Sequence, residues 1–207
     1  MIGVAVMGYG VVGSGVVELI DQNNKIFSEK IGQDIAVKHI LDVRDFPGNK
    51  YESLITKDFN DILSDPETEI VCETIGGAKV AYDFTKRCLC AGKSVVTSNK
   101  ELVATHGTEL LALAKEHGVD YMFEAAVGGG IPIIRPLINC LAANRIDKIV
   151  GILNGTTNYI LTKMIKENST FADALKEAQR LGYAEADPSA DVDGKDTCRK
   201  ICILADL

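Results

Sequence analysis

The sequence contains 207 residues with a net charge of −7 at pH 7, and 46% of them are hydrophobic. This is enough apolar material for a globular core, whereas the acidic balance argues against nucleic-acid partners, because phosphate recognition needs a concentrated basic surface. No apolar run reaches the roughly 18 residues of a membrane span. The first residues already match a strand and a glycine loop, so we expect no signal peptide. Six cysteines without a Cys-x-x-Cys pair fit a reducing, cytoplasmic location.

Short β-branched runs alternate with amphipathic helical stretches over residues 1–126. This alternation predicts an α/β domain with a Rossmann-type, doubly wound parallel sheet. The expected strands cover residues 2–8, 35–43, 68–76, 93–99 and 119–127. The expected helices cover residues 13–24, 58–67, 79–92 and 108–118.

The pattern of expected strands and helices changes at Val127. This change predicts a second, smaller α+β domain over residues 127–207. A glycine loop opens a helix near Pro132, where a first-turn proline is tolerated. We then expect a strand at 146–155, helices at 156–167 and 170–182, and a last helix with Asp193 as its N-cap. The chain stops inside "CRKICILADL", a helical pattern without a capping signal. We therefore expect this second domain to be incomplete.

The run "GYGVVG" (residues 8–13) fits the G-x-G-x-x-G pattern and lies between an expected strand and an expected helix. Gly8 would permit the tight turn, Gly10 the approach of a pyrophosphate, and Gly13 the close packing of helix on strand. The first helical N–H groups, at Val11 and Val12, would face the phosphates. This context favours dinucleotide binding over a purely structural turn.

Three other polar positions follow expected strands, at the edge of an open α/β sheet where ligands bind. Asp42 could hold a ribose 2′-hydroxyl and Arg44 a 2′-phosphate, so NADP is slightly favoured and NAD stays open. Thr74 could face the nicotinamide. Lys100 could bind a cofactor or substrate oxygen or transfer a proton, although a solvated lysine in a helix's first turn fits equally well.

The segment "EAAVGGGIP" (124–132) is rich in small residues. Together with Glu124, its carbonyl oxygens could form a cage for a hard cation. By spacing alone, a flexible joint between domains is the simpler interpretation.

The stretch "GYAEADPSADVDGKDTCRK" (182–200) carries several acids into an almost wholly apolar helix. Asp196 and Lys200 lie about 40° apart on that helix, and its apolar character predicts that the pair is at least partly buried. A buried pair is better suited to proton transfer than a solvent-exposed ion pair is. The alternative is an ordinary surface bridge, worth about 0.3–0.5 kcal/mol.

With "GYGVVG", "TSNK", "EAAVGGGIP", "ILNGTTNYIL" and "GYAEADPSADVDGKDTCRK" in this order, the chain resembles homoserine dehydrogenase over essentially its whole length. The resemblance implies NAD(P)-dependent interconversion of L-homoserine and L-aspartate 4-semialdehyde, on the route to threonine and methionine. It also implies a homodimer formed through the second domain.

The resemblance also assigns roles to residues. Lys200 matches the proton donor and acceptor, and Lys100 a second active-site lysine that contacts cofactor and substrate. The remaining matches are the homoserine-binding acids Glu185, Asp191 and Asp196, the cofactor contact Gly182, and a sodium site at Glu124, Val127, Gly129 and Ile131.

Two rival interpretations remain at this point, and a third lacks the cysteine that it needs. One is another two-domain NAD(P) oxidoreductase, acting on a sugar or a different small amino acid. Aspartate-semialdehyde dehydrogenase needs a nucleophilic cysteine, but Cys88, Cys90 and Cys140 all lie in expected helices. A non-catalytic dinucleotide sensor would bind the cofactor without turnover.

Overall fold

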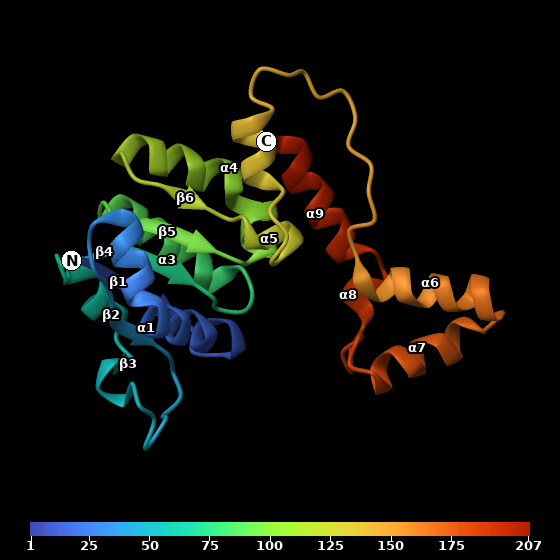
Figure 1. The fold of residues 1–207 in the computed structure, drawn as a ribbon, viewed down its shortest axis with the longest axis horizontal. Helices are drawn as coiled ribbons and strands as arrows, with labels where there is room; N and C mark the ends of the chain where they lie inside the picture. Colours follow the sequence, from blue (N-terminus) through green and yellow to red (C-terminus); the bar gives the residue numbers. More distant parts are fainter. The chain divides into compact units, whose positions relative to one another are not determined.

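A computed structural model describes residues 1–207, which divide into two compact units, residues 1–131 and 132–207 (Figure 1). The boundary between the units falls between Ile131 and Pro132, whereas the sequence pattern predicts a domain boundary at Val127.

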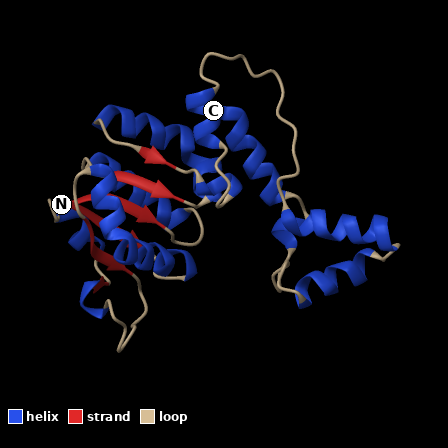
Figure 2. Ribbon diagram, in the orientation of Figure 1, coloured by secondary structure: helices blue, strands red, loops and turns tan.

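The first unit is built on a six-stranded, wholly parallel sheet with strand order β3-β2-β1-β4-β5-β6. Helices cover both faces of this sheet (Figure 2). The strands are β1 (Ile2–Met7), β2 (Ile35–Leu41), β3 (Ile55–Thr56), β4 (Thr68–Glu73), β5 (Ser94–Thr97) and β6 (Tyr121–Met122). The order reverses between β1 and β4, and in such sheets the crevice outside the strand ends at this point binds ligands.

Helices of the first unit follow the strands in alternation, as the sequence predicts. They are α1 (Val11–Ile31), α2 (Phe59–Ser64), α3 (Lys79–Cys90), α4 (Lys100–His117) and α5 (Ala125–Gly128), with a 3-10 turn at Glu52–Leu54. The last expected strand, 119–127, is shorter than expected because α5 takes over its second half. The Rossmann-type fold class is confirmed.

The core of this unit forms where β1 and β2 meet α1. Val4 and Val6 of β1 pack with Val17 and Ile20 of α1 and with Ile40 of β2. A parallel strand covered on both faces must be apolar along its whole length, and β1 is buried from Gly3 to Met7. The continuous apolar run at the N-terminus thus places the glycine loop directly after a rigid strand.

Capping residues define both ends of α4. The Asn99 side chain accepts a hydrogen bond from the Leu102 N–H, and Gly118 ends the helix in the left-handed conformation with φ 68°. The sequence predicted the end of this helix correctly but placed its start at residue 108, eight residues late. Recognition of Asn99 as an N-cap would have placed Lys100 on the helix.

The second unit consists of helices and loops. Its helices are α6 (Gly155–Glu167), α7 (Phe171–Arg180), α8 (Ser189–Val192) and α9 (Lys195–Asp206), with a π-helical turn at Pro136–Cys140. A small core joins α6 to α7, where Ile160 packs against Ala174 and Ala178.

Two predictions for the second unit are wrong. The strand expected at 146–155 is a loop, because no strand within residues 132–207 lies beside it and a strand without a ladder partner gains no hydrogen bonds. Asp193 is not an N-cap, since it follows α8 and Gly194 occupies the N-cap position of α9. None of the helices is both long and apolar enough to cross a membrane.

Candidate functional site

The glycine loop after β1 is a tight backbone cradle. Gly8 has φ +94°, and a Cβ atom there would lie 2.8 Å from the Thr74 carbonyl oxygen. A Cβ atom on Gly13 would lie 1.8 Å from the Gly8 carbonyl oxygen, whereas one on Gly10 would meet nothing within 4 Å. Gly8 and Gly13 therefore allow close contacts between segments of the protein backbone. Gly10, in contrast, faces open space. The N–H groups of Val11 and Val12 open α1 beside that space.

Thr74 supports this loop from the neighbouring strand. It follows β4, and its hydroxyl lies 3.0 Å from the Met7 carbonyl oxygen and 2.8 Å from that of Gly8. Its only proton is therefore committed to the loop backbone. Thr74 thus fixes the ends of β1 and β4 together at the point where the strand order reverses.

Asp42 and Arg44 form one unit at the end of β2. Nε and one terminal nitrogen of Arg44 donate to the two oxygens of Asp42 at 3.0 and 2.9 Å, and Asp42 also accepts from the Tyr9 N–H at 2.8 Å. The hydrogen-bonded Arg44 guanidinium holds the pKa of the Asp42 carboxyl well below its usual range. The Arg44 side chain is nevertheless 58% exposed, so it can still meet an anionic ligand.

A buried network fixes the start of α4 and therefore Lys100. The Glu73 carboxylate, fully buried at the end of β4, accepts from the Ile75 N–H at 2.7 Å and from the Thr97 hydroxyl at 2.5 Å. The Thr97 hydroxyl in turn accepts from the Asn99 N–H at 2.9 Å. Burial raises the pKa of Glu73. Lys100, the first residue of α4, is half-buried next to this network.

The cation loop predicted from the sequence surrounds α5. Glu124 occupies the N-cap position of this short helix, Val127 is buried within it, and Gly129 follows it with φ +58°. The turn after α5 is closed by a hydrogen bond from the Ile131 N–H to the Gly128 carbonyl. That carbonyl is not one of the oxygens in the predicted site.

In the second unit, Lys200 and Asp196 form a buried ion pair. The Lys200 ammonium lies 2.9 Å from Asp196 Oδ2, and the two side chains are 16% and 5% exposed. The ammonium also donates to the Leu153 carbonyl at 2.9 Å. The sequence-based prediction of a partly buried pair is confirmed. Two of the three ammonium hydrogens are used in these contacts, and the third is oriented by them.

Asn154 and Thr156, which carried no predicted role, join this pair to Asp191. The Asn154 amide nitrogen donates to Asp191 at 2.7 Å and to Asp196 at 3.0 Å. The Thr156 hydroxyl lies 2.8 Å from the second oxygen of Asp191 and 2.8 Å from the Tyr183 carbonyl. The sequence signal for these two residues is the segment "ILNGTTNYIL", which contributes to the family resemblance but by itself predicts no chemical role.

Glu185 and Gly182 are not part of the hydrogen-bond network of this cluster. Gly182 follows α7 with φ +78°, and Glu185 is exposed in the next loop. The Glu185 backbone carbonyl accepts from the Gln179 side chain at 3.1 Å. No hydrogen bond connects its carboxylate to Asp191 or Asp196.

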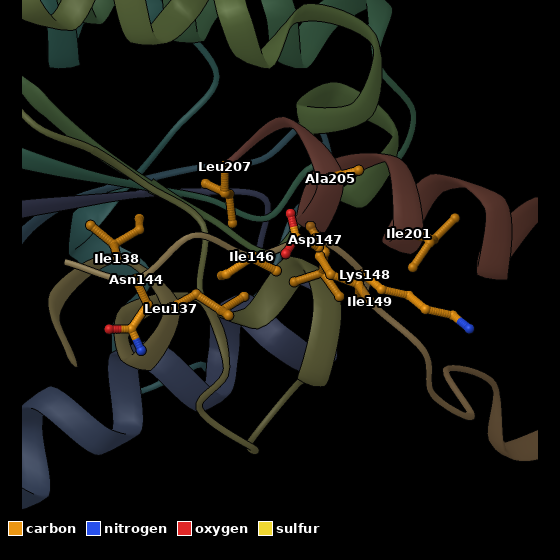
Figure 3. A pocket seen from close by; sticks show the side chains of 11 residues that line it. Leu137, Ile138, Asn144, Ile146, Asp147, Lys148, Ile149, Ile201, Ala205 and Leu207 are labelled. Atoms are coloured by element: carbon orange, nitrogen blue, oxygen red, sulfur yellow. The ribbon is translucent and has the colours of Figure 1, made fainter. Parts of the chain in front are cut away.

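An open groove of about 500 Å³ also lies in the second unit (Figure 3). Ile201 and Leu204 of α9 line it together with Leu137 and Ile149, and the polar side chains Asn144, Asp147 and Lys148 also belong to its lining. Asp196 and Lys200 do not line it. Helix α9 thus contributes separate residues to the groove and to the charged cluster.

Comparison with protein-family models gives two matches. Residues 8–124 match the model described as homoserine dehydrogenase, NAD binding domain, and residues 132–207 match the model described as homoserine dehydrogenase. The first match alone covers more than half of the chain.

Curated relatives and solved structures agree with these matches. Homoserine dehydrogenase of Bacillus subtilis is 47% identical over 99% of this chain, and that of Lactococcus lactis is 42% identical over 100%. These alignments cover 48% and 49% of the two relatives, so the chain spans about half their length. The crystal structure of a homoserine dehydrogenase from Thiobacillus denitrificans superimposes with a TM-score of 0.89 at 43% identity, covering 99% of this chain and 48% of that one. A hyperthermophilic archaeal homoserine dehydrogenase in complex with NADPH gives 0.83 at 31% identity, covering 98% and 68%.

Proposed function

Because the chain belongs to the homoserine dehydrogenase family, we propose that its full-length protein interconverts L-homoserine and L-aspartate 4-semialdehyde with NAD(P). The observation that carries this proposal is the largely buried Lys200–Asp196 pair, held by Asn154 and Leu153 inside the unit that matches the model described as homoserine dehydrogenase. Such an arrangement places one lysine, with a fixed orientation, among carboxylates that suit an amino-acid substrate.

Residues 1–126 would bind the dinucleotide. The open space at Gly10, the N–H groups of Val11 and Val12, and the exposed face of Arg44 fit a pyrophosphate and an adenosine phosphate. Arg44 already neutralises Asp42, the residue that would otherwise prefer a free 2′-hydroxyl. We therefore favour NADP over NAD, and the NADPH complex of one solved relative agrees with this choice.

Residues 127–207 would bind the substrate and supply the proton transfer. A nicotinamide cofactor, when bound, would supply the hydride acceptor for alcohol oxidation and the hydride donor for the reverse reaction. Lys200 would remove the proton of the substrate hydroxyl when the alcohol is oxidised and return it when the aldehyde is reduced. In its protonated form it would also stabilise negative charge that develops on the aldehyde oxygen. Lys100, at the N-terminus of α4, would contact cofactor and substrate.

The acids would bind the ammonium group of the substrate. Asp191 and Asp196 place two carboxylates on either side of the Asn154 amide. A cationic group is attracted to carboxylates. Glu185 and the cofactor contact Gly182 would complete the site from the loop between α7 and α8.

We further propose a sodium ion at the α5 loop. One carboxylate, from Glu124, and the carbonyl oxygens of Val127, Gly129 and Ile131 form the hard oxygen set that such ions prefer. These four residues lie around a single short helical turn, which supports a shared ion.

The full-length protein is also expected to be a cytoplasmic homodimer that assembles through its second domain. The exposed Val150 and Ile152, which follow the groove-lining Ile149 in the chain, support this expectation, because large uncovered apolar surfaces usually lie in interfaces.

The test is an assay of the full-length protein with L-homoserine and either NADP or NAD. Lys200→Arg is the informative variant: it keeps the positive charge next to Asp196, but a guanidinium does not give up its proton. We expect kcat to fall by about 10²- to 10⁴-fold, the usual contribution of a general acid–base group, with an unchanged dissociation constant for the cofactor. Normal turnover by Lys200→Arg would remove Lys200 from this role.

Lys93→Met is the matched control. Lys93 is 5% exposed, and its ammonium donates to the carbonyls of Asp65 and Thr68 at 2.6 and 2.7 Å, neither of which is a predicted site residue. Its loss should lower stability but leave kcat within a few-fold of wild type. Equal losses of kcat in both variants would mean that Lys200 is only a structural lysine.

A further inference from the structure

We infer that Asn154 is a positioning residue that holds the Asp191 and Asp196 carboxylates at a fixed separation and thereby sets the affinity for the substrate's ammonium group. This inference rests on the proposed function. It adds a residue to which the sequence patterns assigned no chemistry.

The orientation of the Asn154 side chain is fixed by the helix that it caps. Its Oδ1 accepts from the N–H of Thr157 at 2.8 Å and from the Thr157 hydroxyl at 2.8 Å. Both partners are donors, so the oxygen must face them and the amide nitrogen must face the opposite way. The cap therefore determines which atom of Asn154 reaches the acids.

The amide nitrogen has two hydrogens, and the structure gives each a carboxylate. One goes to Asp191 Oδ1 at 2.7 Å and the other to Asp196 Oδ2 at 3.0 Å. Asn154 is 6% exposed and Asp196 4%, so water competes little for these bonds. A single planar group thus bridges two like charges from different helices, α8 and α9, and limits how far they can move apart.

The neighbouring residue connects the same arrangement to the lysine. Leu153 accepts a hydrogen bond from Lys200, so residues 153 and 154 together contact all three charged side chains of the cluster. Lys200 keeps its Leu153 contact when the Asn154 amide is removed. Loss of the amide should therefore weaken substrate binding more than it slows the chemical step.

Asn154→Ser separates the bridging role from the capping role. Serine is a good N-cap, but its hydroxyl has one hydrogen and cannot bridge two carboxylates. In the full-length protein we expect KM for L-homoserine to rise by about 10- to 100-fold, as for lost hydrogen bonds to charged groups. We expect kcat to change by less than about tenfold, and KM for NADP to stay unchanged.

Thr170→Ala is the matched control for capping. Thr170 is the N-cap of α7 in the same unit, and its hydroxyl bonds to Asp173 and not to Asp191 or Asp196. Its loss should lower the unfolding midpoint without changing KM for L-homoserine. Asn154→Thr, a second variant that also caps, repeats the test if the serine variant does not fold.

The outcomes separate the two proposals. Absence of homoserine-dependent NADP reduction by the wild-type protein would refute the proposed function itself. An active wild type together with an unchanged KM in a folded Asn154→Ser or Asn154→Thr variant would overturn the role of Asn154 alone.

Discussion

Gly10 and Gly13 lie in the same loop, but replacing each by alanine should have opposite consequences. A Cβ on Gly13 would stand 1.8 Å from the Gly8 carbonyl oxygen, and it would need at least 3.0 Å, so α1 would have to move away from β1 by more than 1 Å. The obstacle is backbone, which no side-chain rotation relieves. We expect the upper end of the usual overpacking cost, about 3 kcal/mol.

The Gly10→Ala variant should fold normally. Its Cβ meets nothing within 4 Å, and its φ of −84° suits any residue. Loss of a good N-cap lowers the free energy of unfolding, whereas a less flexible unfolded chain raises it. The net change in the free energy of unfolding should therefore stay within about 1 kcal/mol. The added methyl group would instead occupy the space that we assign to the pyrophosphate.

Urea unfolding and NADPH fluorescence titration of both full-length variants measure these effects. Gly13→Ala should unfold at clearly lower urea concentration, whereas Gly10→Ala should keep its midpoint and lose NADPH affinity by at least tenfold. Wild-type NADPH affinity in Gly10→Ala would refute the placement of the pyrophosphate. Wild-type stability in Gly13→Ala would refute the packing of α1 on β1.

Two further predictions concern charged groups of the first unit. Arg44→Ala should weaken NADPH binding by about 10- to 100-fold, because a charge-assisted contact is lost. It should leave NADH binding unchanged or improved, because Asp42 is no longer paired with Arg44. Equal loss of affinity for both cofactors in parallel titrations would contradict this prediction. The Glu67 backbone N–H and His39 lower the pKa of Asp65 to about 2, so its stabilisation is complete above the unfolded value of 3.8 and is lost as the pH falls toward 2. Asp65→Asn should therefore have a lower free energy of unfolding than wild type at pH 7, and urea unfolding curves should show this difference shrinking near pH 2.5. A difference in stability that grew on acidification would contradict the inferred pH dependence.

The first unit was predictable because its central strand, β1, is buried on both faces. Such strands are continuous apolar runs, and "IGVAVM" could be placed from local sequence alone. The glycine pattern then located the loop at the strand end, and Gly118 located the end of α4. Each of these signals lies within a few residues of the feature that it predicts.

The charged cluster could be predicted only in part. Asp196 and Lys200 are four residues apart on one helix, so periodicity was enough to bring them together. The contact of Asn154 with Asp196 spans 42 positions of the chain, and no local pattern encodes it. The strand expected at 146–155 failed for a related reason, because β-propensity reflects the neighbours that a segment finds.

Gly194 has φ +75° and stands between α8 and α9. Were residues 189–206 one uninterrupted helix, positions 191 and 196 would point about 140° apart, at 100° per residue. Their carboxylates would then face nearly opposite sides of the rod, and no single amide could touch both. A two-residue break in the helix, at Asp193 and Gly194, is thus what brings the two carboxylates together, and glycine adopts the left-handed conformation there without strain.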